Sequence, residues 1–270
     1  MPTIQVNGVE LFYQESGHGP ETLVFSHGLL MDHSMFAVQR AALESRYRVI
    51  AYDHRGQGQS PDAGHGYDMD TLTQDAAALV RALNAAPCHF AGLSMGGFVG
   101  MRLAARHPEL VRSLILMNTG AGKEGLLNRI RYGFLAQLVK VMSPRPFVPI
   151  AVKELFGADT RRDLAKQAML QEWIARLRSR PRYLGKSILA VMNRRDVFSE
   201  LAAIRCPVLV ITGEDDTARP PADSEKLASA IHDAKLVRIP ASGHSSALEQ
   251  PAAVTAAIQN FLEKAVGVSR

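Results

Sequence analysis

The stretch at positions 88–97, Cys-His-Phe-Ala-Gly-Leu-Ser-Met-Gly-Gly, constrains the fold of this 270-residue chain most strongly. Its first four residues form an apolar run typical of a short buried strand, and a helical pattern follows it. The spacing therefore predicts that Ser94 lies on a sharp turn between strand and helix, flanked by Gly92 and Gly96. On such a turn the serine hydroxyl projects beyond the sheet, at the positive end of the helix. The alternative is a glycine-rich turn around an uninvolved serine.

Apolar runs typical of buried strands alternate with helical patterns along most of the chain. Strands are predicted at 3–6, 9–14, 22–25, 48–52, 88–91, 113–117, 207–212 and 235–239, and helices at 35–43, 70–85, 98–106, 222–231 and 251–265. The first two strands flank Asn7-Gly8, which predicts a hairpin with a type I′ turn. The alternation predicts an α/β fold with a mostly parallel central sheet flanked by helices.

The alternation stops between positions 121 and 205, and this segment is predicted to be a helical insertion. Its helical patterns are interrupted at Pro144, Pro146, Pro149, Gly157 and Pro181. The segment is basic, with 17 Lys and Arg against seven Asp and Glu. We expect a core of residues 1–120 and 206–270, with the insertion lying as a lid (cap) over the carboxyl ends of the strands, where ligands bind in open α/β sheets.

Composition limits the partners of the chain. The net charge of +5 is too small to indicate nucleic acid binding. No apolar run reaches 18 residues and the first residues lack the pattern of a signal peptide, so no membrane association is expected. Cys88 and Cys206 are predicted as buried thiols in a reducing compartment, which favours a cytoplasmic location. The sequence does not indicate an oligomeric state.

A serine hydroxyl is a weak nucleophile and needs a base within hydrogen-bonding distance. Of the nine histidines, His244 has the most suitable context, in a short loop between the last predicted strand and the last helix. The base in turn needs a carboxylate that orients its ring and stabilises its cation. Glu214, Asp215 and Asp216 follow the preceding strand and are the candidates. The alternative is that these acids only cap the following turn.

Five short motifs occur in order and together resemble the landmarks of the α/β-hydrolase fold superfamily. They are Ser-His-Gly-Leu at 26–29, Asp-His-Arg-Gly-Gln-Gly-Gln-Ser at 53–60, Gly-Leu-Ser-Met-Gly-Gly at 92–97, Gly-Glu-Asp-Asp at 213–216 and Gly-His at 243–244. The resemblance covers nearly the whole chain outside the insertion and implies an α/β-hydrolase fold. In the family pattern Gly-x-x-Asp-x-x-x-Pro the triad acid is the fourth residue, here Asp216. The oxyanion would be held by the backbone N–H of Met95, the residue after the nucleophile, and, by resemblance, of Leu29.

The motifs at 27–36, 52–56 and 92–97 look most like those of 3-oxoadipate enol-lactonases. The resemblance implies a serine hydrolase that cleaves a carboxylic ester or lactone through an acyl-enzyme, with a small-molecule substrate and no metal or organic cofactor. The basic insertion would suit a small anionic enol-lactone. Arg129, Arg131 and Trp173 of the insertion are the predicted substrate contacts.

Other activities remain open on the same fold. A general carboxylesterase or another lactonase would use the same residues. A slow-turnover receptor for a small molecule would keep the triad, although such a receptor would be expected to have an apolar insertion rather than a basic one. A cofactor-free perhydrolase or haloperoxidase could use the same pocket.

Overall fold

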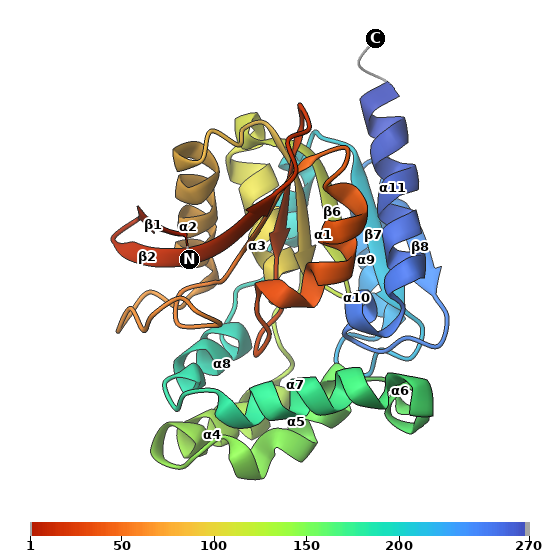
Figure 1. The fold of residues 1–270 in the computed structure, drawn as a ribbon. Coiled ribbons are helices and arrows are strands. Elements are labelled where there is room, and N and C mark those ends of the chain that lie inside the picture. The colour runs from red at the N-terminus through yellow and green to blue at the C-terminus, as the bar shows by residue number, and fades with distance from the viewer. Residues whose placement is uncertain (1, 268–270) are drawn as a thin grey trace.

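The computed structural model describes residues 2–267, and its centre is an eight-stranded sheet covered by helices on both faces (Figure 1). The strand order is β1-β2-β4-β3-β5-β6-β7-β8. β1 and β2 pair antiparallel, as do β2 and β4, and all other neighbouring strands are parallel. The strands are β1 (Thr3–Val6), β2 (Val9–Ser16), β3 (Thr22–Ser26), β4 (Arg48–Tyr52), β5 (Cys88–Leu93), β6 (Val111–Met117), β7 (Val208–Gly213) and β8 (Lys235–Ile239). The predicted α/β fold with a mostly parallel sheet is confirmed.

The hairpin between β1 and β2 turns at Asn7-Gly8, as predicted. The φ angles of Asn7 and Gly8 are 46° and 75°, and positive values at both central residues define a type I′ turn. This turn pairs Val6 directly with Val9.

Helices of the core cover the sheet in two layers. α2, α3 and α9 pack on one face, while α1 and α11 pack on the other. The core helices are α1 (Ala37–Leu43), α2 (Met69–Ala82), α3 (Met95–Arg106), α9 (Pro221–Ala230), α10 (Ser246–Glu249) and α11 (Pro251–Gly267). Short 3₁₀ helices lie at His33–Phe36, Pro108–Leu110, Arg145–Phe147, Leu164–Lys166 and Phe198–Ala203. The short α10 was not predicted from the sequence.

The apolar runs of the central strands are explained by burial on both faces of the sheet. In β3, Leu23 and Phe25 join the cluster beneath α1 and α11, whereas Val24 joins the cluster beneath α2 and α3. All three side chains are fully buried. Burial of each such side chain stabilises the fold by about 1.5–3 kcal/mol. Because both faces of the sheet are covered, these strands show no alternation of apolar and polar residues.

The helical segment between β6 and β7 lies across one end of the sheet (Figure 1). Its helices are α4 (Leu126–Val141), α5 (Val148–Leu155), α6 (Ala158–Arg162), α7 (Gln167–Ser179) and α8 (Leu184–Met192). α4 and α7 end shortly before Pro144 and Pro181, as the sequence indicated. Pro149 does not interrupt a helix, because it lies in the first turn of α5, where a missing N–H removes no helical hydrogen bond.

The turn at Ser94 is tighter than the sequence indicated, because β5 runs to Leu93 and α3 begins at Met95. Ser94 alone joins them, with φ 53° and ψ −109°. The turn places backbones in close contact on both sides. A Cβ on Gly92 would lie 2.2 Å from the carbonyl oxygen of Gly96, and a Cβ on Gly96 would lie 2.0 Å from the carbonyl oxygen of Ser26.

We predict that Gly96→Ala lowers the free energy of unfolding by about 2 kcal/mol or more, because the new methyl group meets backbone that cannot move aside. Gly133→Ala is the control: it lies within α4, and a Cβ there would meet nothing within 4 Å. The control should be neutral or slightly stabilising, since alanine favours a helix interior. Urea unfolding of both variants measures the difference. Equal stability of the two variants would contradict the proposed close contact.

Candidate active site

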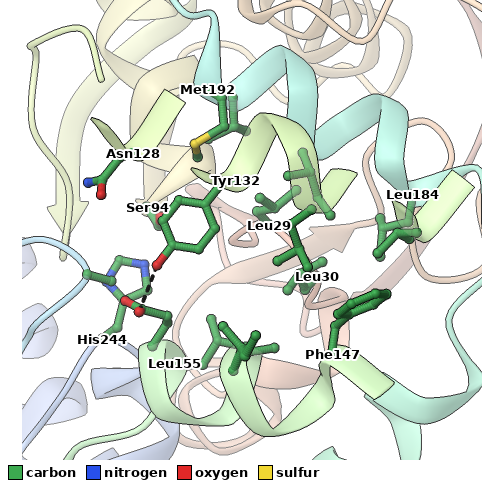
Figure 2. A pocket seen from close by; sticks show the side chains of 18 of the residues that line it. Leu29, Leu30, Ser94, Asn128, Tyr132, Phe147, Leu155, Leu184, Met192 and His244 are labelled. Atoms are coloured by element: carbon green, nitrogen blue, oxygen red, sulfur yellow. Dashed lines mark hydrogen bonds between the residues drawn. The ribbon is translucent and has the colours of Figure 1, made fainter. Parts of the chain in front are cut away.

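Ser94, Asp216 and His244 come from three loops at the same end of the sheet. Ser94 follows β5, Asp216 follows β7 and His244 follows β8. His244 Nδ1 lies 2.9 Å from Asp216 Oδ2. Ser94 and His244 line one cavity, with 8% and 6% of their surfaces exposed (Figure 2). The fold thus gathers a hydroxyl, an imidazole and a carboxylate that are separated by up to 150 positions along the chain.

Asp216 is the acid that the structure places against the imidazole, while Glu214 and Asp215 are exposed. Its Oδ2 also accepts a hydrogen bond from Asn118 Nδ2 at 2.9 Å, and its Oδ1 accepts the backbone N–H of Arg219 at 2.8 Å. Because the carboxylate accepts from Nδ1, the proton of a neutral His244 resides there. Nε2 is then the ring atom able to accept a proton.

Asn118 was not identified from the sequence. It follows β6 directly, in a left-handed backbone conformation with φ 48°. Its amide donates both to Asp216 and to the carbonyl oxygen of Gly243, the residue before His244. Its own oxygen accepts from the Ser246 hydroxyl at 2.5 Å. The only signal in the sequence is an asparagine immediately after an apolar strand, which is too common a pattern to be diagnostic.

Glu249 joins the loop of His244 to the helical insertion. Its carboxylate is 1% exposed and accepts the backbone N–H of Ser245 at 3.0 Å and that of Gly157 at 2.8 Å. The Ser245 N–H also points at the carbonyl oxygen of Leu155, at 3.0 Å. The loop after β8 is therefore held from the insertion side as well as from the sheet.

Two backbone N–H groups near Ser94 have no acceptor among residues 2–267. One belongs to Met95, the first residue of α3, where a helix leaves its N–H groups unpaired. The other belongs to Leu29, in the loop after β3. The neighbouring N–H of Leu30 is already used, since it donates to Gln57 Oε1 at 3.0 Å.

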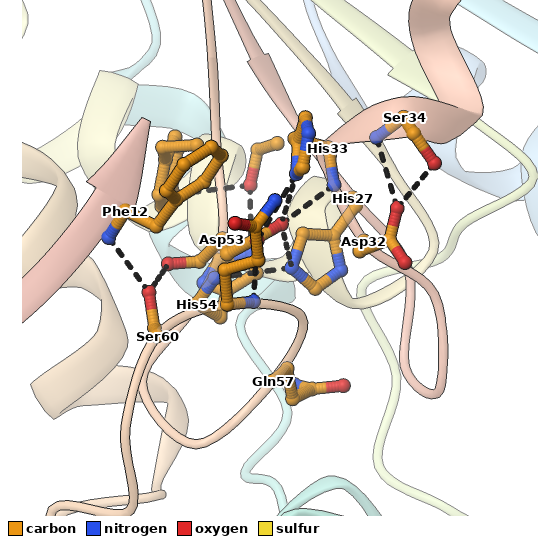
Figure 3. A network of polar contacts seen from close by, with 12 residues as sticks. Phe12, His27, Asp32, His33, Ser34, Asp53, His54, Gln57 and Ser60 are labelled. Carbon is orange, nitrogen blue, oxygen red and sulfur yellow. Dashed lines mark hydrogen bonds and ion pairs between the residues drawn. The ribbon is translucent and has the colours of Figure 1, made fainter. Parts of the chain in front are cut away.

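His27 fixes the loop that carries Leu29, and its protonation follows from its two contacts (Figure 3). Nε2 accepts the backbone N–H of His54 at 3.0 Å, so the proton must be on Nδ1, which donates to the Gly28 carbonyl oxygen at 2.8 Å. Burial lowers the pKa of His27, against the opposing effect of Asp53. A neutral His27 therefore braces this loop.

The glycine-rich segment at 53–60 folds around the carboxylate of Asp53 (Figure 3). Asp53 accepts the backbone N–H groups of His33 at 2.6 Å and Gln59 at 2.8 Å. A Cβ on Gly58 would lie 2.2 Å from Asp53 Oδ2, so only glycine fits there. Asp53 thus holds together the loop after β3, which leads to His33, and the loop after β4, which contains Gln59.

The cavity measures about 320 Å³ and its wall is mostly apolar. Six of the apolar residues are Phe98, Leu135, Val139, Phe147, Leu184 and Ile188. Its lining contains three arginines, two of which are in ion pairs. Arg219 pairs with Glu124, and Arg180 pairs with Asp32 at 2.8 Å. At about 30 Å³ per water-sized group, the space holds roughly ten non-hydrogen atoms.

The three substrate contacts predicted in the insertion lie in different places. Arg131 lines the cavity and is exposed. Arg129 is exposed and outside the cavity lining, and it donates to Asn193 at 3.1 Å. Trp173 is 3% exposed and packs in the core with Leu170, also outside the lining. Of the three, only Arg131 is placed to meet a ligand in this cavity.

Three arginines of the insertion, Arg176, Arg180 and Arg194, pair with buried acids. Asp32 accepts from Arg176 as well as Arg180, and Glu124 pairs with Arg194 at 2.9 Å as well as with Arg219. Burial alone would raise the pKa of Glu124, but Arg219, Asn128 and Arg194 lower it to about 2.

The described part of the chain holds no group of His, Cys, Asp and Glu arranged to bind a metal ion. No helix within residues 2–267 has the length and apolar character needed to cross a bilayer. Cys88 is buried, which raises its thiol pKa to about 12, whereas Cys206 is only partly buried at the residue before Pro207 and β7.

A model of the α/β-hydrolase fold family matches residues 21–251. The chain belongs to this family. It is 32% identical to an α/β-hydrolase superfamily protein of Bacillus subtilis over 94% of this chain and 95% of that protein. It is 30% identical to a 3-oxoadipate enol-lactonase of Acinetobacter baylyi over 92% and 88%. It is also 29% identical to a non-heme haloperoxidase of Rhodococcus erythropolis over 97% and 100%.

Solved structures agree with this assignment. A thermophilic esterase from Thermogutta terrifontis superposes with a TM-score of 0.91 at 27% identity, covering 98% of this chain and 99% of that one. An enol-lactonase from Burkholderia xenovorans superposes with a TM-score of 0.90 at 31% identity, covering 97% and 100%. The resemblance predicted from the motifs is confirmed: the protein is a hydrolase-family enzyme with an esterase and enol-lactonases among its relatives.

Glu124→Gln should lower the free energy of unfolding at pH 7 by about 3 kcal/mol, because it leaves Arg194 buried without a counter-charge. The pKa of Glu124 is lowered from 4.5 to about 2, so the carboxylate stabilises the fold fully above pH 4.5 and loses this effect as the pH falls towards 2. The difference between the variant and the wild type should therefore shrink over that range. Denaturant unfolding at several pH values measures it.

Glu225→Gln is the matched control for Glu124→Gln, since Glu225 pairs with Arg238 at an exposed site. It should change stability by less than about 0.5 kcal/mol. A loss at Glu124 no larger than this control would contradict the role given to the buried cluster.

Glu249→Ala should speed amide hydrogen exchange at Gly157 and Ser245, because both N–H groups lose the buried carboxylate that accepts them. The cost to the free energy of unfolding should be about 2 kcal/mol. Exchange followed by mass spectrometry or NMR measures the first effect, and urea unfolding measures the second. Glu263→Ala, at an exposed pair with Arg46, should alter neither. Unchanged exchange at both amides would show that the carboxylate does not hold them.

Proposed function

We propose that this protein is a serine hydrolase that cleaves carboxylic esters or lactones through an acyl-enzyme. The observation that supports this most directly is the sharing of one cavity by Ser94 and His244, with His244 Nδ1 bonded to the buried carboxylate of Asp216. In this proposal Ser94 is the nucleophile, His244 the general base and acid, and Asp216 the residue that orients the imidazole.

The proposed reaction has two halves. Ser94 Oγ attacks the ester carbonyl while His244 Nε2 takes its proton, and the resulting oxyanion is held by the N–H groups of Leu29 and Met95. His244 then protonates the departing alkoxide, and the carbon–oxygen bond of the ester breaks. Water, deprotonated by the same imidazole, then attacks the acyl-Ser94 carbonyl. The bond between the acyl carbon and Ser94 Oγ breaks, His244 returns the proton to Oγ, and the acid is released.

The positions of these groups support efficient acylation. The N–H of Met95 lies at the N-terminus of α3, whose dipole favours negative charge at that point. Leu29 is held in place by His27 and Gln57, which fix the loops on either side of it. We further propose that the helical insertion at 121–205 acts as a lid that encloses the substrate, since its helices α4, α5 and α8 supply most of the apolar wall.

The cavity favours a small, largely apolar substrate. Its wall is apolar and its space suits roughly ten non-hydrogen atoms. A small anionic enol-lactone, suggested by the relatives, would have to rely on Arg131, because Arg180 and Arg219 are already in ion pairs. We therefore propose a neutral ester or lactone rather than an anionic one.

A second candidate is a peroxide-dependent side reaction in the same cavity, in which hydrogen peroxide replaces water and the acyl-enzyme yields a peracid. It is supported by the similarity to a protein named a non-heme haloperoxidase, which extends over 97% of this chain. Acetate-dependent halogenation of a dye in the presence of peroxide tests it.

Ser94→Ala should lower kcat for p-nitrophenyl acetate by about four to six orders of magnitude, leaving the residual rate due to the oxyanion donors. The wild type should turn over continuously; a single burst followed by near silence would favour a slow-turnover receptor. Ser229→Ala, on the exposed face of α9, is the control and should keep full activity. Activity of Ser94→Ala equal to that of the control would overturn the assignment of the nucleophile.

A further inference from the structure

Two polar residues of the insertion enter the cavity beside the candidate nucleophile. Tyr132 comes from α4 and Glu154 from α5, and the Tyr132 hydroxyl donates to Glu154 Oε1 at 2.7 Å (Figure 2). Figure 2 shows Tyr132 at the end of the cavity that holds Ser94 and His244, whereas Phe147 and Leu184 lie at the other end. A carboxylate and a phenol thus interrupt the mostly apolar wall close to Ser94 and His244.

Glu154 differs from the other acids of this region in lacking a cation. Glu124 and Asp32 each pair with two arginines. No Lys or Arg forms an ion pair with Glu154 in the part of the chain that the structure describes, and Tyr132 is its hydrogen-bond donor there. Glu154 lines the cavity, and its Oε2 has no hydrogen-bond donor among residues 2–267, so a substrate group is free to donate to this carboxylate.

Tyr132 is held in its protonated form. Burial, together with the hydrogen bond to Glu154, raises the pKa of Tyr132 to about 12. The phenol therefore remains a donor near neutral pH and keeps Glu154 oriented into the cavity. The Arg131 guanidinium lies 5.0 Å from the centroid of the Tyr132 ring and steadies that ring from outside.

We propose that Tyr132 and Glu154 form a specificity subsite that receives a hydrogen-bond donor of the substrate, a hydroxyl or an ammonium group, on an otherwise apolar ester or lactone. This inference rests on the proposed function of Ser94 and His244. A substrate carboxylate would meet the like charge of Glu154 and is disfavoured. The subsite thus distinguishes donors from anions within the same small cavity.

A matched set of acetate esters tests the subsite. Butyl acetate, 4-hydroxybutyl acetate, 4-aminobutyl acetate and 4-acetoxybutanoate differ only at the end of the alcohol chain. All four give the same acetyl-enzyme, so differences in kcat/KM arise in binding and acylation. The corresponding methyl esters of pentanoic acid with the same end groups place the substituent on the acyl side. Acetate or methanol release measures each rate.

In at least one series the wild type should favour the hydroxyl or ammonium ester over the carboxylate ester by about tenfold or more in kcat/KM. Glu154→Gln keeps an acceptor but removes the charge, and it should lower this ratio by about tenfold. Tyr132→Phe should lower the ratio as well, by releasing Glu154. Glu172→Gln, on the exposed surface of α7, removes a charge outside the cavity and should leave the ratio unchanged.

The two proposals fail in different ways. If Ser94→Ala retains the activity towards butyl acetate, the proposed function fails and the subsite with it. If Ser94→Ala is inactive but Glu154→Gln and Tyr132→Phe, both folded by thermal melting, keep the wild-type ratio, only the subsite is overturned. A wild type that prefers the carboxylate ester in both series would also overturn it.

Discussion

The close contact between backbones at the turn of Ser94 is the constraint on which the site depends. Gly92 and Gly96 allow β5 to pass directly into α3, with Ser94 in a left-handed conformation that a serine adopts only under such constraint. The same contact presses α3 against the Ser26 carbonyl, at the end of β3. It therefore fixes Ser94, the candidate nucleophile, and the N-terminus of α3 relative to the loop of Leu29 in a single packing arrangement.

Around this turn, polar networks fix the loops that carry the remaining groups. Asp53 and His27 hold the loops after β3 and β4, and Asn118 and the Arg219 N–H hold Asp216. Glu249 then ties the His244 loop to the insertion. These networks are buried, so a group that lost its hydrogen-bond partner would lower the free energy of unfolding. Other positions of the loops are therefore disfavoured.

Much of the fold was predictable because its signals are local. The Asn7-Gly8 turn, the doubly buried strand β3 and the pentapeptide around Ser94 each show their structure in a few consecutive residues. Asn118, Glu249 and the Tyr132–Glu154 pair were not predictable, because their partners lie far away in the sequence and their residue types are common. The sequence alone predicts that Pro149 interrupts a helix, but it lies in the first turn of α5. A proline in that position and a proline that ends a helix can be distinguished only when the start of the helix is known.

The charge of the insertion is a second feature of the site that could not be interpreted from the sequence alone. The excess of Lys and Arg at 121–205 suggested binding of an anion. Arg176 and Arg180, however, pair with Asp32 of the core, and Arg194 pairs with Glu124 of the insertion itself, which composition cannot reveal. The cavity offers a mostly apolar wall instead, and among the Arg and Glu side chains that line it, those of Arg131 and Glu154 form no ion pair within residues 2–267. Substrate preference in this account therefore depends on which charges remain unpaired and not on how many there are.

In the proposed reaction, Ser94 carries the acyl group during turnover. The most direct measurement is acid quenching of the enzyme during steady-state hydrolysis of a p-nitrophenyl ester, followed by intact-mass analysis and peptide mapping. The account predicts one acyl group per chain, located on Ser94. An enzyme that shows a burst of p-nitrophenol but carries no adduct, or that carries the acyl group on a different residue, would contradict it.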